Sequence, residues 1–399
     1  MHRPLVILSH VTHAAVTEGF LPAARKRGLS VVLISDHAQE HRRLLATSDF
    51  PAQDLLILEC DVFNPLAVIE LINAHGLRPA AVFSNSDHLQ TATALVAKTF
   101  NVPGKVWLMC HWAKNKAVMR ERMQDLGLPG PWFHVLTAGS AVPDDAVFPL
   151  VVKPTQGVAS LDVRLCHNAD ELSDYCARFW QQQPGRALLL EAYMEGPLFT
   201  LETLGDGQRL QAIGGFDVSL SPPPHFVELA ARWNGSLSVN HRAGALAQVA
   251  AFGINFGVCH SEFILTAEGP VLVEINYRSI GDGREFLLDR LLPQGWFNRI
   301  LGVHLDEPLV DAQPGLAQAL VHYLVADTPG RLQQASSSFR YEQDNHWSDY
   351  RALREIGDDI HVSHSNKDYL GVLRLIAPDT ASLDARFAAT LADLRWVMA

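Results

Sequence analysis

Four polar residues near the middle of the sequence have types and spacing that suit metal and phosphate chemistry: Glu262, Glu274, Asn276 and Arg278. A β-strand points residues two apart to the same face, so the last three would share one surface. If the preceding apolar run pairs with this strand, Glu262 lies within cross-strand reach of them. Two carboxylates and an amide oxygen are ligands that Mg²⁺ accepts, with water and phosphate oxygens completing its coordination. The same pattern also fits two solvated strands with salt bridges, so it becomes specific only together with other motifs.

Two lysines add to this pattern. Lys153 ends an apolar run and is followed by Pro154 and the small-residue loop 155–160. An ammonium group beside the backbone amides of such a loop is a common way to hold phosphates. Lys116, within the helical stretch 114–120, offers a second ammonium group, although helix surfaces carry lysine routinely.

The first hundred residues alternate short apolar runs with helical stretches, which is typical of a parallel α/β sheet. Strands are expected at residues 5–8, 31–34, 55–58 and 80–83. Helices are expected at residues 16–27, 65–75 and 88–100, with Asp87 as the N-cap of the last. Ligands bind beyond the carboxyl ends of such strands, where the sequence places His10, His13, Asp36, Ser84, Asn85 and Asp87. For His10 and His13 we favour loop capping, because two histidines without a third ligand are weak support for a metal site.

Beyond a closing turn at residues 101–104, the sequence predicts a second group of elements. An amphipathic helix is expected at 114–126, ended by Gly127. Further strands are expected at 148–153, 162–166 and 186–193, and further helices at 169–181 and 243–252. Antiparallel hairpins are expected over 199–217 and 257–275, and the last hundred residues have the pattern of a mixed α+β unit.

Composition narrows the class of protein. A chain of 399 residues suggests roughly two to four structural units. With 48% hydrophobic and 19% charged residues it matches a globular enzyme, and its net charge of -11 argues against nucleic-acid binding. Neither a signal peptide nor a membrane span is indicated, so cytoplasm is the expected location. Five cysteines without Cys-x-x-Cys spacing indicate neither a disulfide framework nor a zinc site.

Five motifs, taken in order, resemble those of the ATP-grasp superfamily over roughly residues 1–300. They are Phe83-Ser-Asn-Ser-Asp87 through Gly104, Lys116-Ala-Val-Met-Arg120 through Pro129, Val151-Val-Lys-Pro154, Leu190-Glu-Ala-Tyr-Met-Glu-Gly196, and Gly257-Val-Cys-His-Ser-Glu262 with Leu272-Val-Glu-Ile-Asn-Tyr-Arg278. The resemblance implies an ATP-grasp fold of the α/β and α+β classes in three parts. These are an N-terminal parallel α/β domain (1–105), an ATP-grasp domain (106–300, with a lid at about 115–205) and a C-terminal α+β domain (301–399).

The resemblance also implies which residues bind ATP. Phosphates would meet Lys116, Lys153, Gly157 and Ser160. Adenine would meet Glu191 and the backbone of Ala192 and Tyr193, and Glu195 and Glu202 are the candidates for ribose.

The metal and catalytic roles follow from the same resemblance. Magnesium, with manganese as an alternative, would be held by Glu262, Glu274 and Asn276. The catalytic residues would be Arg278, which stabilises the transferred phosphoryl group, Asn276, and His260, which lies close to the acceptor carboxylate.

Some segments depart from the family pattern. The phosphate loop has a single glycine, Gly157, and Leu198-Phe199 stands where many relatives have a polar residue near the ribose. Asp282 and Arg284 follow Arg278 in place of a simpler glycine pair and are candidates for substrate choice. The proline-rich segment 221–228 and Arg232 resemble a substrate-facing region of the amino-acid ligase branch, and a stiff surface loop is the alternative.

The expected function is that of an ATP-dependent carboxylate–amine ligase, which forms an amide or peptide bond through an acyl phosphate and releases ADP and phosphate. An amino acid is the expected substrate, in small-metabolite biosynthesis of the peptide or siderophore type. The expected partners are small carboxylate and amine substrates, without nucleic acid or membrane, and a homodimer is compatible with the sequence. The alternatives are a biotin-carboxylase-like or purine-pathway ATP-grasp enzyme, and a non-catalytic nucleotide-binding regulatory protein.

Overall fold

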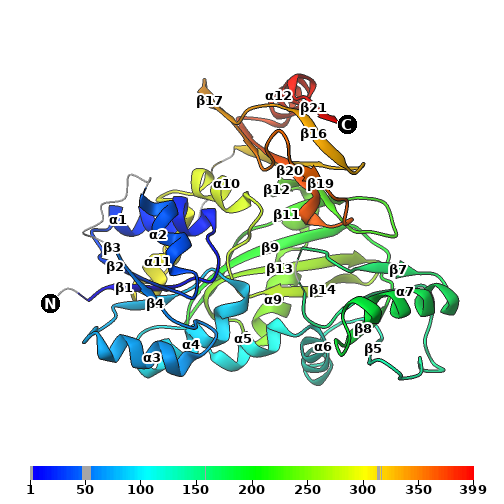
Figure 1. The fold of residues 1–399 in the computed structure, drawn as a ribbon, viewed down its shortest axis with the longest axis horizontal. Helices are drawn as coiled ribbons and strands as arrows, with labels where there is room; N and C mark the ends of the chain where they lie inside the picture. Colours follow the sequence, from blue (N-terminus) through cyan, green and yellow to red (C-terminus); the bar gives the residue numbers. More distant parts are fainter. Residues whose placement is uncertain (1–2, 47–54, 158, 312–314, 316) are drawn as a thin grey trace.

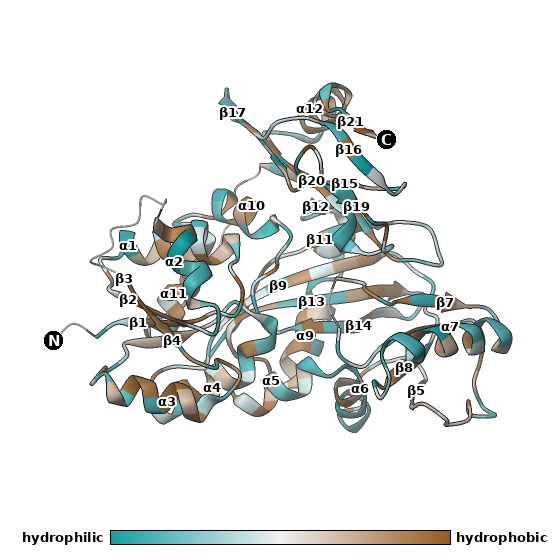
Figure 2. Cartoon of the chain, viewed as in Figure 1, coloured by the Kyte–Doolittle hydropathy of each residue, from teal (hydrophilic) through white to brown (hydrophobic). Residues whose placement is uncertain are grey.

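In the computed structural model, which describes residues 3–46, 55–157, 159–311, 315 and 317–399, the chain begins with a four-stranded parallel sheet (Figure 1). Its strand order is β3-β2-β1-β4, and all four predicted strands are present. They are β1 (Leu5–Leu8), β2 (Val31–Ser35), β3 (Leu55–Glu59) and β4 (Ala81–Phe83). Every residue of β1, β2 and β4 is buried, which explains the uninterrupted apolar runs in the sequence (Figure 2).

Helices surround this sheet. They are a π-helical turn η1 (Ala15–Phe20), α1 (Leu21–Lys26), α2 (Ala38–Ala46), α3 (Pro65–Ala74), a 3₁₀ turn η3 (Asp87–Leu89) and α4 (Gln90–Thr99). The sequence did not predict α2, because it is short and mostly polar and buries only Ala38, His41 and Leu45. The predicted N-cap role of Asp87 is wrong, since its carboxylate forms an ion pair with Lys114 instead.

The helix predicted over residues 114–126 is present as α6 (Lys116–Asp125), which begins two residues later than expected. A separate helix before it, α5 (Trp107–Lys114), was not predicted. Asn115 lies between them in an extended conformation. Its side chain accepts hydrogen bonds from the amides of Ala117 and Val118, at 3.0 and 3.3 Å. This cap sets the first residue of α6, which is Lys116.

A four-stranded antiparallel sheet, which we call the lid sheet, follows in the order β5-β8-β6-β7. Its strands are β5 (Phe133–Leu136), β6 (Leu150–Pro154), β7 (Arg164–Cys166) and β8 (Leu188–Ala192), and α7 (Ala169–Gln182) connects β7 to β8. The amphipathic α7 buries Leu172, Cys176 and Phe179 together with β6 and β8.

The largest sheet is antiparallel and runs β14-β13-β9-β11-β12-β15-β20-β18-β17, with β10 paired to β9. Both predicted hairpins are present in it, as β9 with β10 and as β13 with β14. Its strands are β9 (Leu198–Asp206), β10 (Leu210–Gly214), β11 (Phe216–Leu220), β12 (Glu228–Trp233), β13 (Phe256–Thr266), β14 (Gly269–Asn276), β15 (Gln318–Val325), β17 (Phe339–Gln343), β18 (His346–Ala352) and β20 (Tyr369–Ala377). The helices between these strands are α8 (Ser236–Asn240), α9 (Arg242–Phe252), α10 (Arg284–Leu291) and α11 (Trp296–His304).

Although α11 comes late in the chain, it lies among the N-terminal elements (Figure 1). The ring of Phe297 packs edge-on against Phe20, with centroids 4.9 Å apart. Arg27 forms an ion pair with Glu307 just beyond the helix, at 2.6 Å. The N-terminal sheet is therefore packed against the later part of the chain.

The C-terminal strands extend the large sheet across the boundary expected near residue 300, because β15, β18 and β20 all belong to it. A small sheet of β16 (Gly330–Ala335), β19 (Asp359–Ile360) and β21 (Trp396–Met398), the turn η4 (Asn366–Asp368) and α12 (Thr380–Asp393) complete this part. The division of the chain into three domains stays a prediction. Within the described part of the chain, no helix is both long and apolar enough for a bilayer crossing.

Two asparagine caps offer a test of the helix starts. Asn115 caps α6, and Asn64 caps α3 in the same way, by accepting from two backbone amides. We expect Asn115→Ala and Asn64→Ala each to lower the free energy of unfolding by about 0.5–2 kcal/mol in urea titrations, because two amides lose their acceptor. Asn115→Asp should retain most of the stability, and a loss as large as that of Asn115→Ala would contradict the capping role.

Candidate active site

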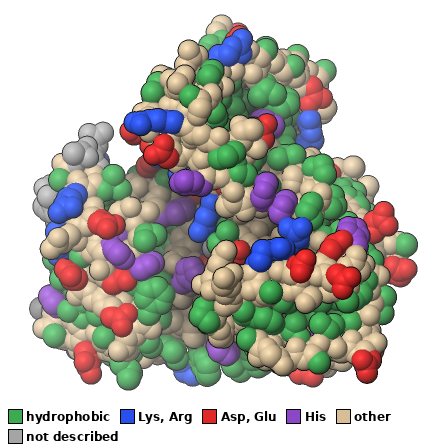
Figure 3. Space-filling model, turned by 45° about the vertical axis from the view of Figure 1, so that its right-hand side comes forward, with side chains coloured by type: hydrophobic (Ala, Val, Ile, Leu, Met, Phe, Trp, Pro, Cys, Tyr) green, Lys and Arg blue, Asp and Glu red, His purple; other side chains and the backbone are tan. Residues whose placement is uncertain are grey.

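A cavity of about 450 Å³ lies between the N-terminal sheet, the lid sheet and the hairpin β13–β14. Its wall also includes the segment from Arg278 to Arg284 and one residue of the C-terminal part, Asn366. Figure 3 shows the hollow on the molecular surface, with histidine, lysine and arginine side chains gathered around it. Because all parts of the chain contribute to the wall, this cavity is the candidate site.

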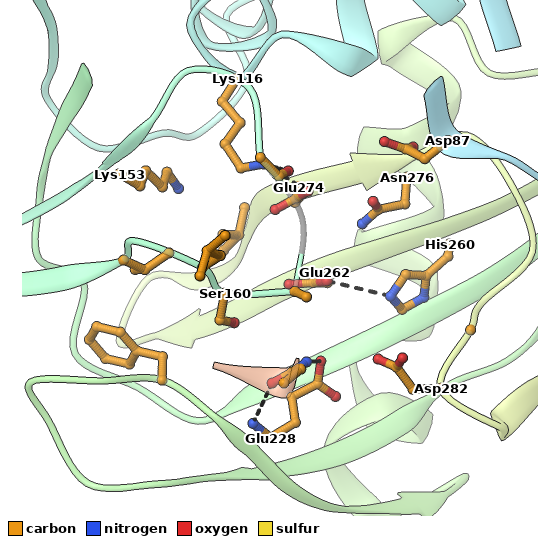
Figure 4. Close-up of a pocket in the computed structure, with 18 of the residues that line it drawn as sticks. Asp87, Lys116, Lys153, Ser160, Glu228, His260, Glu262, Glu274, Asn276 and Asp282 are labelled. Atoms are coloured by element: carbon orange, nitrogen blue, oxygen red, sulfur yellow. Dashed lines mark hydrogen bonds and ion pairs between the residues drawn. The ribbon is translucent and has the colours of Figure 1, made fainter. Parts of the chain in front are cut away.

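The hairpin brings together the oxygen ligands expected from the sequence. Glu262 of β13 lies directly opposite Glu274 of β14, and His260 lies opposite Asn276. All four side chains line the cavity, and Figure 4 shows the three oxygen-bearing groups along one surface of the two strands. The geometry of paired strands therefore gives two carboxylates and an amide on one face, a set of donors that fits Mg²⁺.

His260 is held between two carboxylates. Its Nδ1 lies 2.7 Å from Glu202, and its Nε2 lies 3.5 Å from Glu262. Burial would lower the pKa of His260, but the carboxylates Glu202 and Glu262 outweigh it and raise that pKa to about 9. His260 is therefore positively charged at neutral pH. Glu202 is completely buried beneath it and does not line the cavity, so ribose cannot reach this carboxylate.

Lys116 faces the hairpin from the start of α6. Its Nζ lies 3.0 Å from Glu274 and donates to the carbonyl of Gly157 at 3.1 Å. Burial alone would lower the pKa of Lys116, yet the neighbouring Glu274 raises it overall. The side chain therefore joins the hairpin to the phosphate loop predicted from the sequence.

Lys153 is part of a buried ionic triad with Glu191 and Arg120. One oxygen of Glu191 is 2.5 Å from Lys153, and the other is 2.5 Å from Arg120. Burial would raise the pKa of Glu191, but Arg120 and Lys153 lower it to about 2. Glu191 thus stays ionised and orients Lys153. The sequence did not single out Arg120, because its role depends on a contact with a residue 71 positions away.

The segment expected to meet adenine, Glu191 to Tyr193, lines the cavity. Several of its polar groups are already bonded within the protein and are not free to bind a ligand. The amides of Ala192 and Tyr193 donate to the carbonyls of Trp132 and Pro149, at 2.9 and 3.0 Å. Both oxygens of Glu191 are engaged in the triad. Glu195 is exposed and is not part of the cavity wall.

Two residues of the phosphate loop, Gly157 and Ser160, line the cavity as expected from the sequence. Ala159, Ser160 and Asp162 have positive φ values of 60°, 54° and 60°, so this loop turns sharply without further glycines. The carbonyl of Ala159 accepts from the amide of Asn366 at 3.1 Å. The C-terminal part of the chain therefore contacts the loop directly.

Arg278 lies just after β14, in a tightly held backbone segment. The carbonyl of Tyr277 accepts from the ammonium of Lys105, and the amide of Ser279 donates to Asn85 at 3.2 Å. Both Lys105 and Asn85 belong to the N-terminal region. The guanidinium contacts the amide oxygen of Asn276 at 3.4 Å and lines the cavity, as expected from the sequence.

A second ion pair in the wall was not predicted as a pair. Arg284 binds Glu228 at 2.8 Å, and Asn366 donates to the other oxygen of Glu228 at 3.3 Å. Asp282 lines the cavity beside them. Charge pairing across 56 positions leaves no local pattern. The sequence therefore indicated Arg284 and the segment 221–228, which contains Glu228, only as separate candidates for substrate contact.

Of the residues expected to face substrate, some line the cavity and Arg232 does not. Phe226 and Glu228 reach the cavity. Arg232 points elsewhere and forms an ion pair with Asp384 of α12 at 2.5 Å. His13 behaves as predicted for a loop cap, because its Nδ1 accepts from the amide of Ala15 at 3.1 Å.

The chain is similar in sequence to known proteins at identities below 30%. No protein-family model matches the sequence. It is 25% identical over 330 residues to the uncharacterised protein y4rH of Sinorhizobium fredii, covering 79% of this chain and 68% of that protein. It is 29% identical over 289 residues to carnosine synthase 1 of Gallus gallus, covering 65% of this chain but only 30% of that enzyme. The chain thus corresponds to less than a third of the carnosine synthase.

Among solved structures, the L-amino acid ligase from Bacillus licheniformis superposes on this chain with a TM-score of 0.77. The match covers 100% of both chains at 18% sequence identity. The structural neighbours are ATP-grasp enzymes, so the fold predicted from the sequence is confirmed.

The buried triad generates a prediction about stability. We expect Glu191→Gln to lower the free energy of unfolding by about 3–5 kcal/mol at pH 7, because Arg120 and Lys153 lose their shared counter-charge. The pKa of Glu191 lies at about 2 in the folded chain against an ordinary 4.5. The wild-type advantage should therefore be complete above pH 4.5 and shrink as the pH falls toward 2.

Denaturant titrations across this pH range measure the difference. Exposed Glu195 provides the matched control, and Glu195→Gln should change stability by no more than about 0.5 kcal/mol. An equal effect of the two substitutions would show that the triad does not contribute.

Proposed function

We propose that this chain, which has the ATP-grasp fold, is an ATP-dependent carboxylate–amine ligase that forms an amide or peptide bond and releases ADP and phosphate. One observation carries the proposal. Around a single cavity, the oxygen donors Glu262, Glu274 and Asn276 face the ammonium groups of Lys116 and Lys153 (Figure 4). A triphosphate with its metal ion needs both kinds of group within one site.

The hairpin would hold the magnesium ion. Glu262, Glu274 and Asn276 offer two carboxylates and one amide oxygen, which leaves coordination positions for water and phosphate oxygens. When bound, Mg²⁺ neutralises charge on the phosphate oxygens during transfer. The Lys116 ammonium is already 3.0 Å from Glu274, so a phosphate beside this carboxylate would also meet a lysine.

The lid sheet would hold the nucleotide. Lys153, fixed by Glu191, and the loop with Gly157 and Ser160 would contact the phosphates. The adjoining part of the wall is apolar and includes Val151, Met194, Ile264 and Val273. A flat aromatic base suits such a surface, with backbone groups of the segment after β8 supplying polar contacts.

Arg278 would stabilise the negative charge that develops on oxygen atoms during the reaction. A carboxylate oxygen of the acid substrate attacks the terminal phosphorus of ATP, and the bond from that phosphorus to ADP breaks. The amine then attacks the carbonyl carbon of the acyl phosphate, phosphate leaves, and the amine loses a proton. A guanidinium in the cavity wall stabilises the oxygens that carry negative charge in both steps.

An amino acid is the substrate class that the cavity and the relatives favour together. The carnosine synthase named above is called after a dipeptide, and the L-amino acid ligase is called after amino acids. The wall near Arg278 also carries the carboxylates Asp87 and Asp282. Cationic and anionic groups side by side suit a zwitterion, whereas bicarbonate or formate would need only the cation.

The first test identifies the products. Incubating the full chain and Mg-ATP with amino acids and small acids, singly and in pairs, should release ADP and phosphate for at least one pair that includes an amino acid. Release of AMP and pyrophosphate would overturn the mechanism. Turnover with bicarbonate or formate alone would favour the biotin-carboxylase-like or purine-pathway alternative, and tight ATP binding without any turnover would favour a regulatory protein.

The second test concerns the residues. We expect Arg278→Ala and Glu274→Gln each to lower kcat by about 10²–10³, because each removes a charge that stabilises phosphoryl transfer. Arg232→Ala is the matched control, since Arg232 pairs with Asp384 and does not line the cavity. Steady-state ADP release should be close to wild type for the control, and near-native kcat of the first two variants would contradict the site assignment.

A further inference from the structure

A second group of metal-binding side chains lies at the carboxyl ends of β1 and β2. His10 follows β1, and Asp36 and His37 follow β2. One ligand atom from each of the three residues lies within 4.8 Å of those from the other two. The two strands pair in parallel, so both of their following loops emerge at the same edge of the sheet. The sequence offered His10 and His13 without a recognisable third ligand. In the structure, His10 is instead grouped with Asp36 and His37 of the loop that follows β2.

We propose that His10, Asp36 and His37 form a binding site for a divalent transition-metal ion of the Zn²⁺ type. Two imidazoles and one carboxylate are the ligands of many zinc sites that keep a further position for water or another ligand. This donor set differs from the all-oxygen set of the hairpin, which suits magnesium. The inference does not depend on the proposed ligase activity.

The distances support a shared ion. Asp36 lies 2.8 Å from Nδ1 of His10 and 3.9 Å from Nε2 of His37. Ligand atoms around a tetrahedral zinc ion lie about 3.4 Å apart, given zinc–ligand bonds of about 2.1 Å. The present separations bracket that value. Small rotations of the partly exposed side chains would bring the three atoms around one ion.

The surroundings hold the rings in the required orientation. Nε2 of His37 is turned toward Asp36, while its Nδ1 lies 3.5 Å from Glu40. A carboxylate on the far nitrogen is the partner that metal-binding histidines usually have, because it sets the tautomer and the ring orientation. Glu40 therefore occupies the place of an outer partner to the metal.

One hydroxyl joins the two loops. Ser35 donates to the carbonyl of His10 at 2.9 Å and accepts from the amide of His37, also at 2.9 Å. The ring of His41 contacts the same carbonyl at 3.2 Å. The backbones that carry the ligands are thus fixed before any ion arrives. His10 also lines the cavity, whereas Asp36 and His37 do not, so the cluster adjoins the N-terminal part of the cavity wall.

Cobalt binding tests the proposal. The full chain, freed of metal by a chelator and without a polyhistidine tag, is titrated with Co²⁺ in excess Mg²⁺, which keeps the hairpin occupied. We expect one Co²⁺ per chain with the strong visible absorption of nitrogen-ligated, four-coordinate cobalt, and we expect Zn²⁺ to abolish it. The absence of this absorption in the wild-type chain would overturn the proposal.

Substitutions of the proposed ligands test whether the bound Co²⁺ is held by His10, Asp36 and His37. Asp36→Asn and His37→Gln keep side-chain size, and each should weaken Co²⁺ binding by more than the roughly 10- to 100-fold that losing an outer partner causes. His75→Gln is the control, because His75 lies at the end of α3 and binds only the carbonyl of Leu71 there. Glu274→Gln should leave the absorption unchanged. Unaltered binding by both cluster variants, with circular dichroism confirming their fold, would equally overturn the proposal.

Discussion

The ion pairs that Lys116 and Lys153 make with carboxylates are the constraint on which the candidate site depends. Both ammonium groups are buried, and an isolated buried charge is too costly to persist in a folded protein. Glu274 meets one lysine and Glu191 meets the other. Each carboxylate comes from a different sheet, so the lid sheet and the hairpin must both be in place for the two lysines to share one cavity.

Most helices, strands and hairpins could be predicted from the sequence, because they are determined by the spacing of apolar residues and by the residues that form turns. The hairpin β13–β14 was predicted with Glu262 within cross-strand reach of Glu274, since the alternation of strand residues decides which side chains share a face. The structure adds the register, in which the two residues lie directly opposite each other. The break at Asn115 was missed because an asparagine within a polar helical stretch looks the same whether it caps a helix or continues one. Helix α2 was missed because it is short and mostly polar.

The long-range partners could not be predicted. Arg120 acquires its role only through Glu191, and Asn366 only through Glu228 and the phosphate loop. The sequence placed His10 and Asp36 at the carboxyl ends of predicted strands, but it did not single out His37, and the proximity of the three side chains depends on the parallel pairing of β1 and β2. Fold and motif order were accessible from the sequence, whereas the assignment of each charge to its partner required the tertiary structure.

The attachment of the Arg278 segment has a consequence for how this chain can vary. Lys105 and Asn85 hold the backbone on either side of Arg278, and both belong to the N-terminal region. A chimaera that exchanges this region for that of another protein with the same fold would keep Arg278 in its sequence. It would lose the support of the backbone around Arg278 unless residues equivalent to Lys105 and Asn85 were present. Recombination after the N-terminal region must therefore preserve these two contacts if the guanidinium is to keep its position in the cavity wall.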